Sequence, residues 1–230
     1  MIEDIFMPIK RIISGLNDFQ QNYFKAHQDL FQRLSRGQTP EILFITCCDS
    51  RIAPNLLTQT EPGEIFIIRN IGNIIPPYGT LNSSEGAGIE YAVQALNIKE
   101  IIICGHSLCG SIKGLLQLQN LYDQMPLVYD WLKVYGESIR RIIGENYSEY
   151  SGEELLSIAT QTNVLNQIAN LETYPVVRSR LHAGKLHLHA WVYEIETGRI
   201  LAYDVKQNQF VPLEQEPFPV PDLLAIINPS

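Results

Sequence analysis

Three short, continuously apolar segments decide the fold: Glu41-Ile-Leu-Phe-Ile-Thr46, Glu64-Ile-Phe-Ile-Ile-Arg69 and Glu100-Ile-Ile-Ile-Cys104. Strands of a parallel sheet that is covered on both faces lack the alternation of a half-exposed strand, and these segments lack it too. Residues 84–96, between the second and third segments, form a predicted helix with Ser84 as its cap. This strand–helix–strand order predicts an α/β fold with a mostly parallel central β-sheet flanked by helices.

The flanking sequence adds helices on one side and a hairpin on the other. Residues 8–35 repeat apolar residues at nearly 3.6 positions, which predicts an N-terminal helical arm. Residues 185–194 alternate and meet 199–205 across Glu196-Thr-Gly198, which predicts an antiparallel edge hairpin. Further helical patterns cover residues 110–119, 126–146 and 153–171.

These elements predict three parts of the chain. Residues 1–36 form the helical arm, residues 37–207 the α/β domain and residues 208–230 a C-terminal tail. The tail is rich in proline, and we expect it to be loosely ordered or to pack on a partner.

Composition narrows the function. Of 230 residues, 45% are apolar and 18% are charged, as in an ordinary globular protein, and we expect no membrane-spanning helix. The net charge of -8 argues against nucleic acid or an anionic membrane as a partner. The acidic start, with Glu3 and Asp4, differs from a secretory signal, so we expect a cytoplasmic protein. Its four cysteines are then thiols for a metal, a nucleophile or the core, and not a disulfide framework.

The unusual residues follow the strands. Cys47 comes directly after the first strand, and His106 and Cys109 follow the third. Ligands of open parallel sheets gather at the carboxyl ends of strands, and two thiolates with one imidazole suit zinc. Since these residues are far apart in the chain, the fold must assemble the site. Three protein ligands leave a fourth place for water, which favours a catalytic metal over a structural one.

Asp49 leaves two alternatives open. Its carboxylate could fill the fourth place on the metal, or it could pair with Arg51 and accept a hydrogen bond from metal-bound water. Zinc with two thiolates and a neutral imidazole carries no net charge, so it should acidify water less than zinc held by three imidazoles. We therefore expect activity to grow toward alkaline pH.

Three motifs together carry a family resemblance: Cys47-Cys-Asp-Ser-Arg51, Arg69-Asn-Ile-Gly-Asn73 and Gly105-His-Ser-Leu-Cys-Gly110. Over residues 8–205 the chain resembles the β-class carbonic anhydrases, and Phe44 makes it more similar to the plant and cyanobacterial branch. The resemblance implies a zinc lyase, carbonate dehydratase, that hydrates carbon dioxide reversibly to bicarbonate and a proton through zinc-bound hydroxide. It places this chemistry in residues 37–207, at a dimer interface.

The resemblance also implies roles for single residues. Cys47, His106 and Cys109 match the zinc ligands, and Asp49 with Arg51 matches the dyad that orients zinc-bound water. The residues expected to contact the substrate are Gln38, as a donor to substrate oxygen, the apolar wall Phe66, Ile71 and Tyr91, and Gly110, as a backbone donor.

Expected partners follow from the same family. The resemblance implies a homodimer or a higher even oligomer, with the helical arm lying across the neighbouring subunit. Some cyanobacterial members have a longer C-terminal tail and reside in carboxysomes. This chain lacks most of such a tail, so contact with carboxysome proteins rests on the resemblance alone.

Other interpretations of the residues stay open. The chain could be a zinc-stabilised interaction module, or a hydrolase acting on a sulfur analogue of carbon dioxide. Cys48 could be an extra metal ligand, a site of oxidation or a small core residue, and we expect the last of these. We expect Cys104 to be a core residue, and His187 with His189 to be surface or interface histidines in preference to a second metal site. Arg69 could either hold the Asn70 loop or contact an anion.

Overall fold

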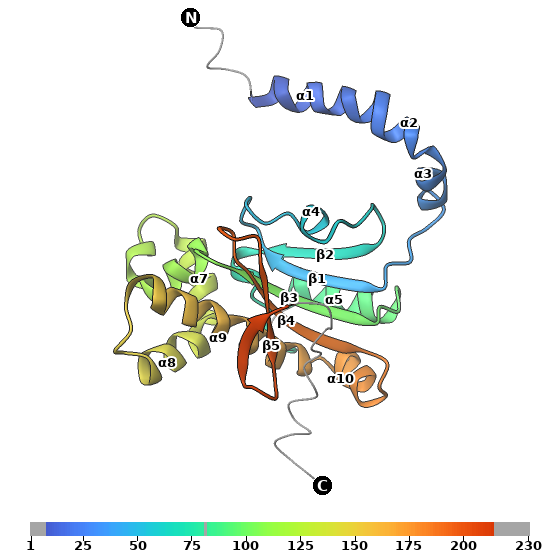
Figure 1. Ribbon diagram of the computed structural model, residues 1–230. Helices are drawn as coiled ribbons and strands as arrows, with labels where there is room; N and C mark the ends of the chain where they lie inside the picture. Colours follow the sequence, from blue (N-terminus) through green and yellow to red (C-terminus); the bar gives the residue numbers. More distant parts are fainter. Residues whose placement is uncertain (1–7, 81, 214–230) are drawn as a thin grey trace, which may run out of the picture. The chain divides into compact units, whose positions relative to one another are not determined.

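A computed structural model describes residues 8–80 and 82–213, and the chain divides into two compact units, residues 1–39 and 40–230. The first unit is helical but is not the single helix that periodicity predicted. A π-helical turn at Phe19–Tyr23 and a break at His27, whose φ is -115°, bend it (Figure 1). The helices on either side are α1 (Pro8–Asp18), α2 (Phe24–Ala26) and α3 (Gln28–Leu34).

The second unit contains a six-stranded sheet in the order β2-β1-β3-β4-β5-β6 (Figure 1). The first four strands in this order run parallel, and β5 and β6 are antiparallel additions at one edge. This confirms the predicted α/β fold with an antiparallel edge. The strands are β1 (Ile42–Cys47), β2 (Ile65–Asn70), β3 (Glu100–His106), β4 (His187–Tyr193), β5 (Ile200–Asp204) and β6 (Gln209–Pro212).

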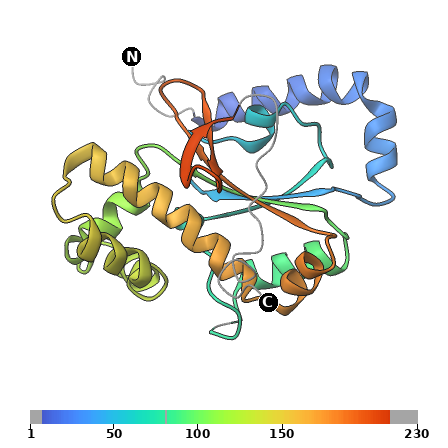
Figure 2. The same ribbon diagram turned by 60° about the horizontal axis from the view of Figure 1, so that its bottom comes forward.

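Helices cover the sheet and extend the domain beside it. One face of the sheet packs on α5 (Ser84–Gln94), α9 (Gly152–Glu172) and α10 (Pro175–His182), with α9 running along the sheet (Figure 2). The alternate residues Phe44, Ile102 and Cys104 face the other way, toward the short α4 (Pro54–Thr58). A separate apolar cluster joins α6 (Gly110–Leu116), α7 (Pro126–Tyr135), α8 (Glu137–Asn146) and the start of α9.

The structure corrects four local expectations. Ser83, not Ser84, caps α5, with its hydroxyl accepting from the Gly86 amide. The helix expected over 126–146 breaks at Gly136, where a Cβ would lie 2.6 Å from a Leu115 methyl group and from the Leu132 carbonyl oxygen. Residues 209–212 form β6 where a loose tail was expected, and α10 was not predicted at all. Residues 214–230 of the expected tail lie outside the described residues.

Candidate metal centre and catalytic site

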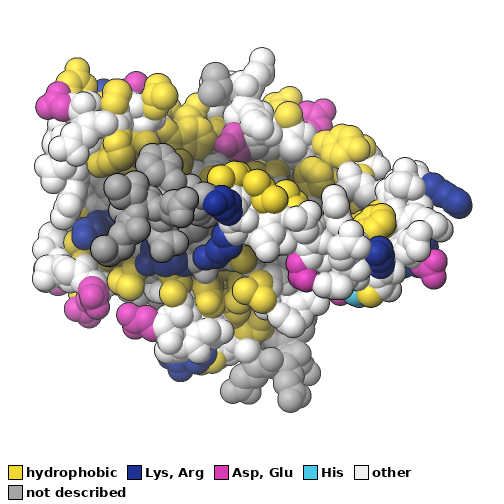
Figure 3. Space-filling model, turned by 90° about the horizontal axis from the view of Figure 1, so that it is seen from above, with side chains coloured by type: hydrophobic (Ala, Val, Ile, Leu, Met, Phe, Trp, Pro, Cys, Tyr) yellow, Lys and Arg dark blue, Asp and Glu magenta, His cyan; other side chains and the backbone are white. Residues whose placement is uncertain are grey.

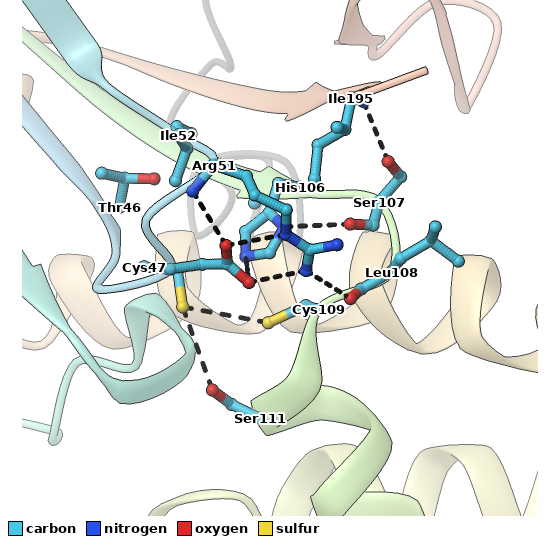
Figure 4. A network of polar contacts seen from close by, with 12 residues as sticks. Thr46, Cys47, Arg51, Ile52, His106, Ser107, Leu108, Cys109, Ser111 and Ile195 are labelled. Atoms are coloured by element: carbon cyan, nitrogen blue, oxygen red, sulfur yellow. Dashed lines mark hydrogen bonds and ion pairs between the residues drawn. The ribbon is translucent and has the colours of Figure 1, made fainter. Parts of the chain in front are cut away.

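Three predicted ligands converge where parallel strands end (Figure 4). Cys47 is the last residue of β1, His106 the last of β3, and Cys109 the residue that precedes α6. Each is at most 3% exposed, and their ligand atoms lie within 4.8 Å of one another. The two sulfur atoms are 3.9 Å apart. Tetrahedral zinc with Zn–S bonds of about 2.3 Å would require about 3.8 Å, so the sulfur spacing fits zinc.

The imidazole of His106 is oriented for a metal. Its Nδ1 donates to the carbonyl oxygen of Ser107 at 2.9 Å, which fixes the tautomer and leaves Nε2 with a free lone pair. This Nε2 is buried and has no hydrogen-bond partner among the described residues. A buried nitrogen without a partner is costly, and a metal ion at the centre of the cluster would satisfy it.

The two thiols share a proton. The thiol of Cys109 donates to the sulfur of Cys47, and this hydrogen bond lowers the pKa of Cys47 to about 3 despite its burial. The same hydrogen bond, together with burial, raises the pKa of Cys109 far above its ordinary value. Cys47 therefore favours the thiolate form that binds a metal, and ionising Cys109 as well requires a cation beside it.

Asp49 lies beside this cluster and is held by Arg51. Its Oδ1 accepts from Arg51 Nε at 2.9 Å and from the Arg51 backbone amide at 3.0 Å, and its Oδ2 accepts from the guanidinium at 2.7 Å. These bonds keep the pKa of Asp49 well below its usual range. Oδ2 also lies 3.7 Å from His106 Nε2, so the carboxylate stands next to the place that a metal would take.

Arg69 holds the loop that carries these residues. Its guanidinium group donates to three carbonyl oxygens of the loop, those of Cys47 at 3.1 Å, Asp49 at 2.8 Å and Ile52 at 2.9 Å. Arg69 therefore has a structural role, but it holds the loop that follows β1 and not the Asn70 loop, as the sequence had suggested.

Sequence reasoning missed Ser111. Its hydroxyl lies 3.9 Å from Cys47 Sγ, and its position in the first turn after Cys109 was the available signal.

The structure brings together only some of the residues that were expected to contact the substrate. The rings of Phe66 and Tyr91 are 6.0 Å apart, so β2 and α5 bring these two together. Ile71 follows β2 and is 38% exposed, and Gly110 begins α6 directly after a ligand. Gln38 belongs to the N-terminal unit and is exposed, and its contact with substrate stays a prediction.

The remaining cysteines differ from each other. Cys104 is fully buried, and burial raises its pKa to about 12, which confirms it as a core residue. Cys48 is exposed, so the expectation of a small core residue was wrong: it begins the loop after β1, outside the covered part of the strand.

His187 and His189, which were expected to be surface or interface histidines, lie near the start of β4. His187 and His189 both contact the carboxylate of Glu100, at 3.3 and 2.8 Å, where β3 begins and far along the strand from His106. Among the described residues, Cys47, His106 and Cys109 form the one group of three with metal-binding geometry. This argues against a second metal site. His187 is exposed, as expected of a surface histidine, whereas His189 is only 6% exposed, so the surface or interface expectation was wrong for His189.

Comparisons with known proteins agree with the site. Residues 42–200 match the family described as carbonic anhydrase. A carbonic anhydrase of Synechocystis sp. is 55% identical over 203 residues, covering 88% of this chain and 74% of that protein.

Two solved structures are also similar. The β-carbonic anhydrase CcaA has 54% identity and a TM-score of 0.88, covering 90% of this chain and all of that one. A β-carbonic anhydrase of the filamentous ascomycete Sordaria macrospora, described as tetrameric, has 31% identity and a TM-score of 0.74, covering 84% and 95%.

The residues described contain no helix long and apolar enough to cross a bilayer.

The match spans the strands that deliver the Cys–His–Cys cluster, and this cluster has the donor set and spacing that zinc requires. The chain therefore belongs to the carbonic anhydrase family, and within it to the zinc-dependent β class.

Proposed function

We propose that Asp49 serves the carbonic anhydrase reaction as a fixed hydrogen-bond acceptor beside the metal, and not as its fourth ligand. This proposal rests on one observation: the guanidinium group of Arg51 donates hydrogen bonds to both carboxylate oxygens of Asp49. When bound, zinc acts as a Lewis acid that lowers the pKa of water and so supplies a nucleophile for carbon dioxide.

The electrostatics of Asp49 support this role. Because its pKa lies well below the usual range, the carboxylate stays ionised and can only accept hydrogen bonds. It can therefore orient a water molecule without storing the proton that hydration releases. Arg51 also donates to the carbonyl oxygen of Leu108 at 3.0 Å, which ties the dyad to the loop between His106 and Cys109.

The substrate needs little further recognition. Carbon dioxide is small and apolar, so contact with Phe66, Tyr91 and Ile71 would suffice to hold it. Developing negative charge on its oxygens calls for donors, and we assign these roles to Gln38 and to the backbone amide of Gly110.

A second copy of the chain is the expected partner, as a homodimer or a higher even oligomer. The Sordaria relative is tetrameric, and the apolar stripe of α1 is not buried within the chain. Many hydrophobic side chains are exposed on the surface seen in Figure 3, and the large exposed ones of α1 are Ile9, Ile12, Ile13 and Leu16, each at least 51% exposed. Burying such a stripe against another subunit would stabilise the oligomer.

A cytoplasmic site of action, with carboxysome packaging in a cyanobacterial host, remains a prediction from the family resemblance. Cell fractionation with carboxysome purification tests it.

The test of the proposed function combines metal analysis with stopped-flow hydration of carbon dioxide from pH 7 to 9. We expect about one zinc ion per chain and a rate that rises with pH. Light scattering on the same sample should report a dimer or larger species. Zinc-loaded protein with no rate above buffer would contradict the function, and a fully active monomer would contradict the shared site.

A further inference from the structure

The hydrogen-bond ladder between β3 and β4 continues beyond the last residues of both strands. His106 pairs with Tyr193 at the end of the parallel register, and the amide of Ser107 donates to the carbonyl oxygen of Tyr193 at 2.8 Å. Parallel ladders space their bonds evenly, so the next bond should run from the amide of Ile195 to the carbonyl oxygen of Ser107. Instead, the amide of Ile195 donates at 3.0 Å to the side-chain hydroxyl of Ser107 (Figure 4).

The carbonyl oxygen of Ser107 has another partner. It accepts from Nδ1 of His106 at 2.9 Å, the bond that leaves Nε2 of this imidazole for a metal. The two possible donors require different carbonyl directions, because a ladder bond lies in the plane of the sheet whereas a strand side chain such as His106 stands out of it. The hydroxyl of Ser107 therefore accepts the ladder bond and leaves the carbonyl oxygen free to turn toward the imidazole.

The next residue, Leu108, is strained. Its φ is +54°, in the left-handed region that a leucine rarely adopts. Such a conformation persists only where surrounding contacts hold it. On one side of Leu108 the Ser107 hydroxyl is bonded to Ile195, and on the other side Arg51 donates to the carbonyl oxygen of Leu108 at 3.0 Å. This turn connects the ligands His106 and Cys109, so its shape affects where both of them point.

We propose that Ser107 is a positioning residue for zinc: its hydroxyl takes the ladder bond from Ile195, so that its carbonyl oxygen stays on Nδ1 of His106. The group that accepts from the second nitrogen of a ligand histidine fixes the tautomer and the orientation of the ring, and its loss weakens metal binding. The inference rests on zinc binding by His106 and is independent of the role proposed for Asp49. Zinc binding by the unaltered protein therefore checks the premise separately from the result.

Three variants of Ser107 test the role of the hydroxyl. Ser107→Ala and Ser107→Val remove it, so the amide of Ile195 should turn to the backbone carbonyl at position 107 and compete with His106. Ser107→Thr keeps the hydroxyl and has nearly the shape of Ser107→Val, so this pair isolates the effect of the oxygen. The matched control is Ser83→Ala, because the Ser83 hydroxyl also accepts from a backbone amide at 3.0 Å, that of Gly86, but at the start of α5.

The measurements are zinc dissociation constants from chelator competition and nuclear magnetic resonance of zinc-loaded protein with isotope-labelled histidines. The proton on Nδ1 of His106 should exchange slowly with water while the carbonyl oxygen holds it, and substitution of zinc by a spin-active cadmium isotope identifies this ring by its coupling to Nε2. We expect Ser107→Ala and Ser107→Val to bind zinc about tenfold more weakly and to lose the slowly exchanging proton. Ser107→Thr and Ser83→Ala should stay within about twofold of the unaltered protein.

Either hydroxyl-free variant that folds decides the outcome. An unchanged zinc affinity or an unchanged Nδ1 proton in that variant would overturn the proposal, as would an equal loss of affinity in Ser107→Thr or Ser83→Ala. The unaltered protein gives a test that needs no variant: the amide of Ile195 should exchange slowly with solvent, and rapid exchange there would also overturn the proposal.

Discussion

Asp49 and Arg51 form a two-point ion pair across two residues of one loop, with 2.9 Å between Oδ1 and Nε and 2.7 Å between Oδ2 and the guanidinium NH2 group. A planar guanidinium matches a carboxylate in this geometry, and the pair turns Asp49 into a rigid acceptor. Since Arg51 also contacts the carbonyl oxygen of Leu108, movement of the loop between two metal ligands would be transmitted to Asp49.

Asp49→Asn should keep zinc and lose most activity. The amide has nearly the same shape, but one of its ends donates, so it can no longer accept from Arg51 and water together. We expect kcat/KM for hydration to fall by about 100-fold, with zinc content unchanged. Full activity in a zinc-loaded sample would show that Asp49 does not orient water.

Arg51→Lys should have a smaller effect of the same kind. An ammonium group keeps the charge but cannot hold both carboxylate oxygens at once, so Asp49 becomes more mobile and its pKa rises toward the ordinary value. We expect an activity loss of about tenfold. Stopped-flow rates beside those of Asp49→Asn measure it, and a loss larger than that of Asp49→Asn would mean that Arg51 has a role of its own.

Variants of Cys109 and Cys104 should distinguish a metal ligand from a core residue. Cys109→Ala should lose zinc, because only two protein ligands, Cys47 and His106, remain to bind it. Cys104→Ala should keep zinc, since this thiol is fully buried in the sheet and its pKa is raised to about 12. Metal content by atomic spectroscopy distinguishes the two, and zinc retained at full occupancy in Cys109→Ala would contradict the assigned ligand set.

We expect Tyr174 to make the free energy of unfolding depend on pH in the alkaline range. Its hydroxyl donates to the carbonyl oxygen of Pro76 at 2.8 Å, and burial raises its pKa to about 12. Because the pKa in the unfolded chain is about 10, the stabilisation is complete below pH 10 and is lost as the pH rises through 12. Tyr174→Phe should cost about 1 kcal/mol at pH 8, and this difference should shrink above pH 10.

Urea unfolding at several pH values measures the effect. Tyr122→Phe is the control, since Tyr122 is 60% exposed, and it should leave the free energy of unfolding nearly unchanged. A Tyr174→Phe difference that stays constant up to pH 11.5 would contradict the prediction.

The sequence alone determined the parallel sheet and the zinc ligands. Continuous apolar runs at 41–46, 64–69 and 100–104 are local patterns, and each is followed directly by its functional residues. Strands that bury both faces need such runs. Parallel strands bring their carboxyl ends to one edge of the sheet, so the sequence alone predicted that Cys47, His106 and Cys109 lie close together.

Tertiary structure decided what depends on contacts between distant segments. At the break, a Cβ on Gly136 would lie 2.6 Å from a methyl group of Leu115, which belongs to another helix, and β6 pairs with the edge of β5. Some side-chain hydrogen bonds join residues that are far apart in the sequence. Arg69 donates to the carbonyl oxygen of Ile52, 17 positions away, and Asn163 donates to that of Gly72, 91 positions away. No local periodicity encodes such pairs, because which buried polar groups meet depends on how the elements pack, and that is settled only when the whole domain has folded.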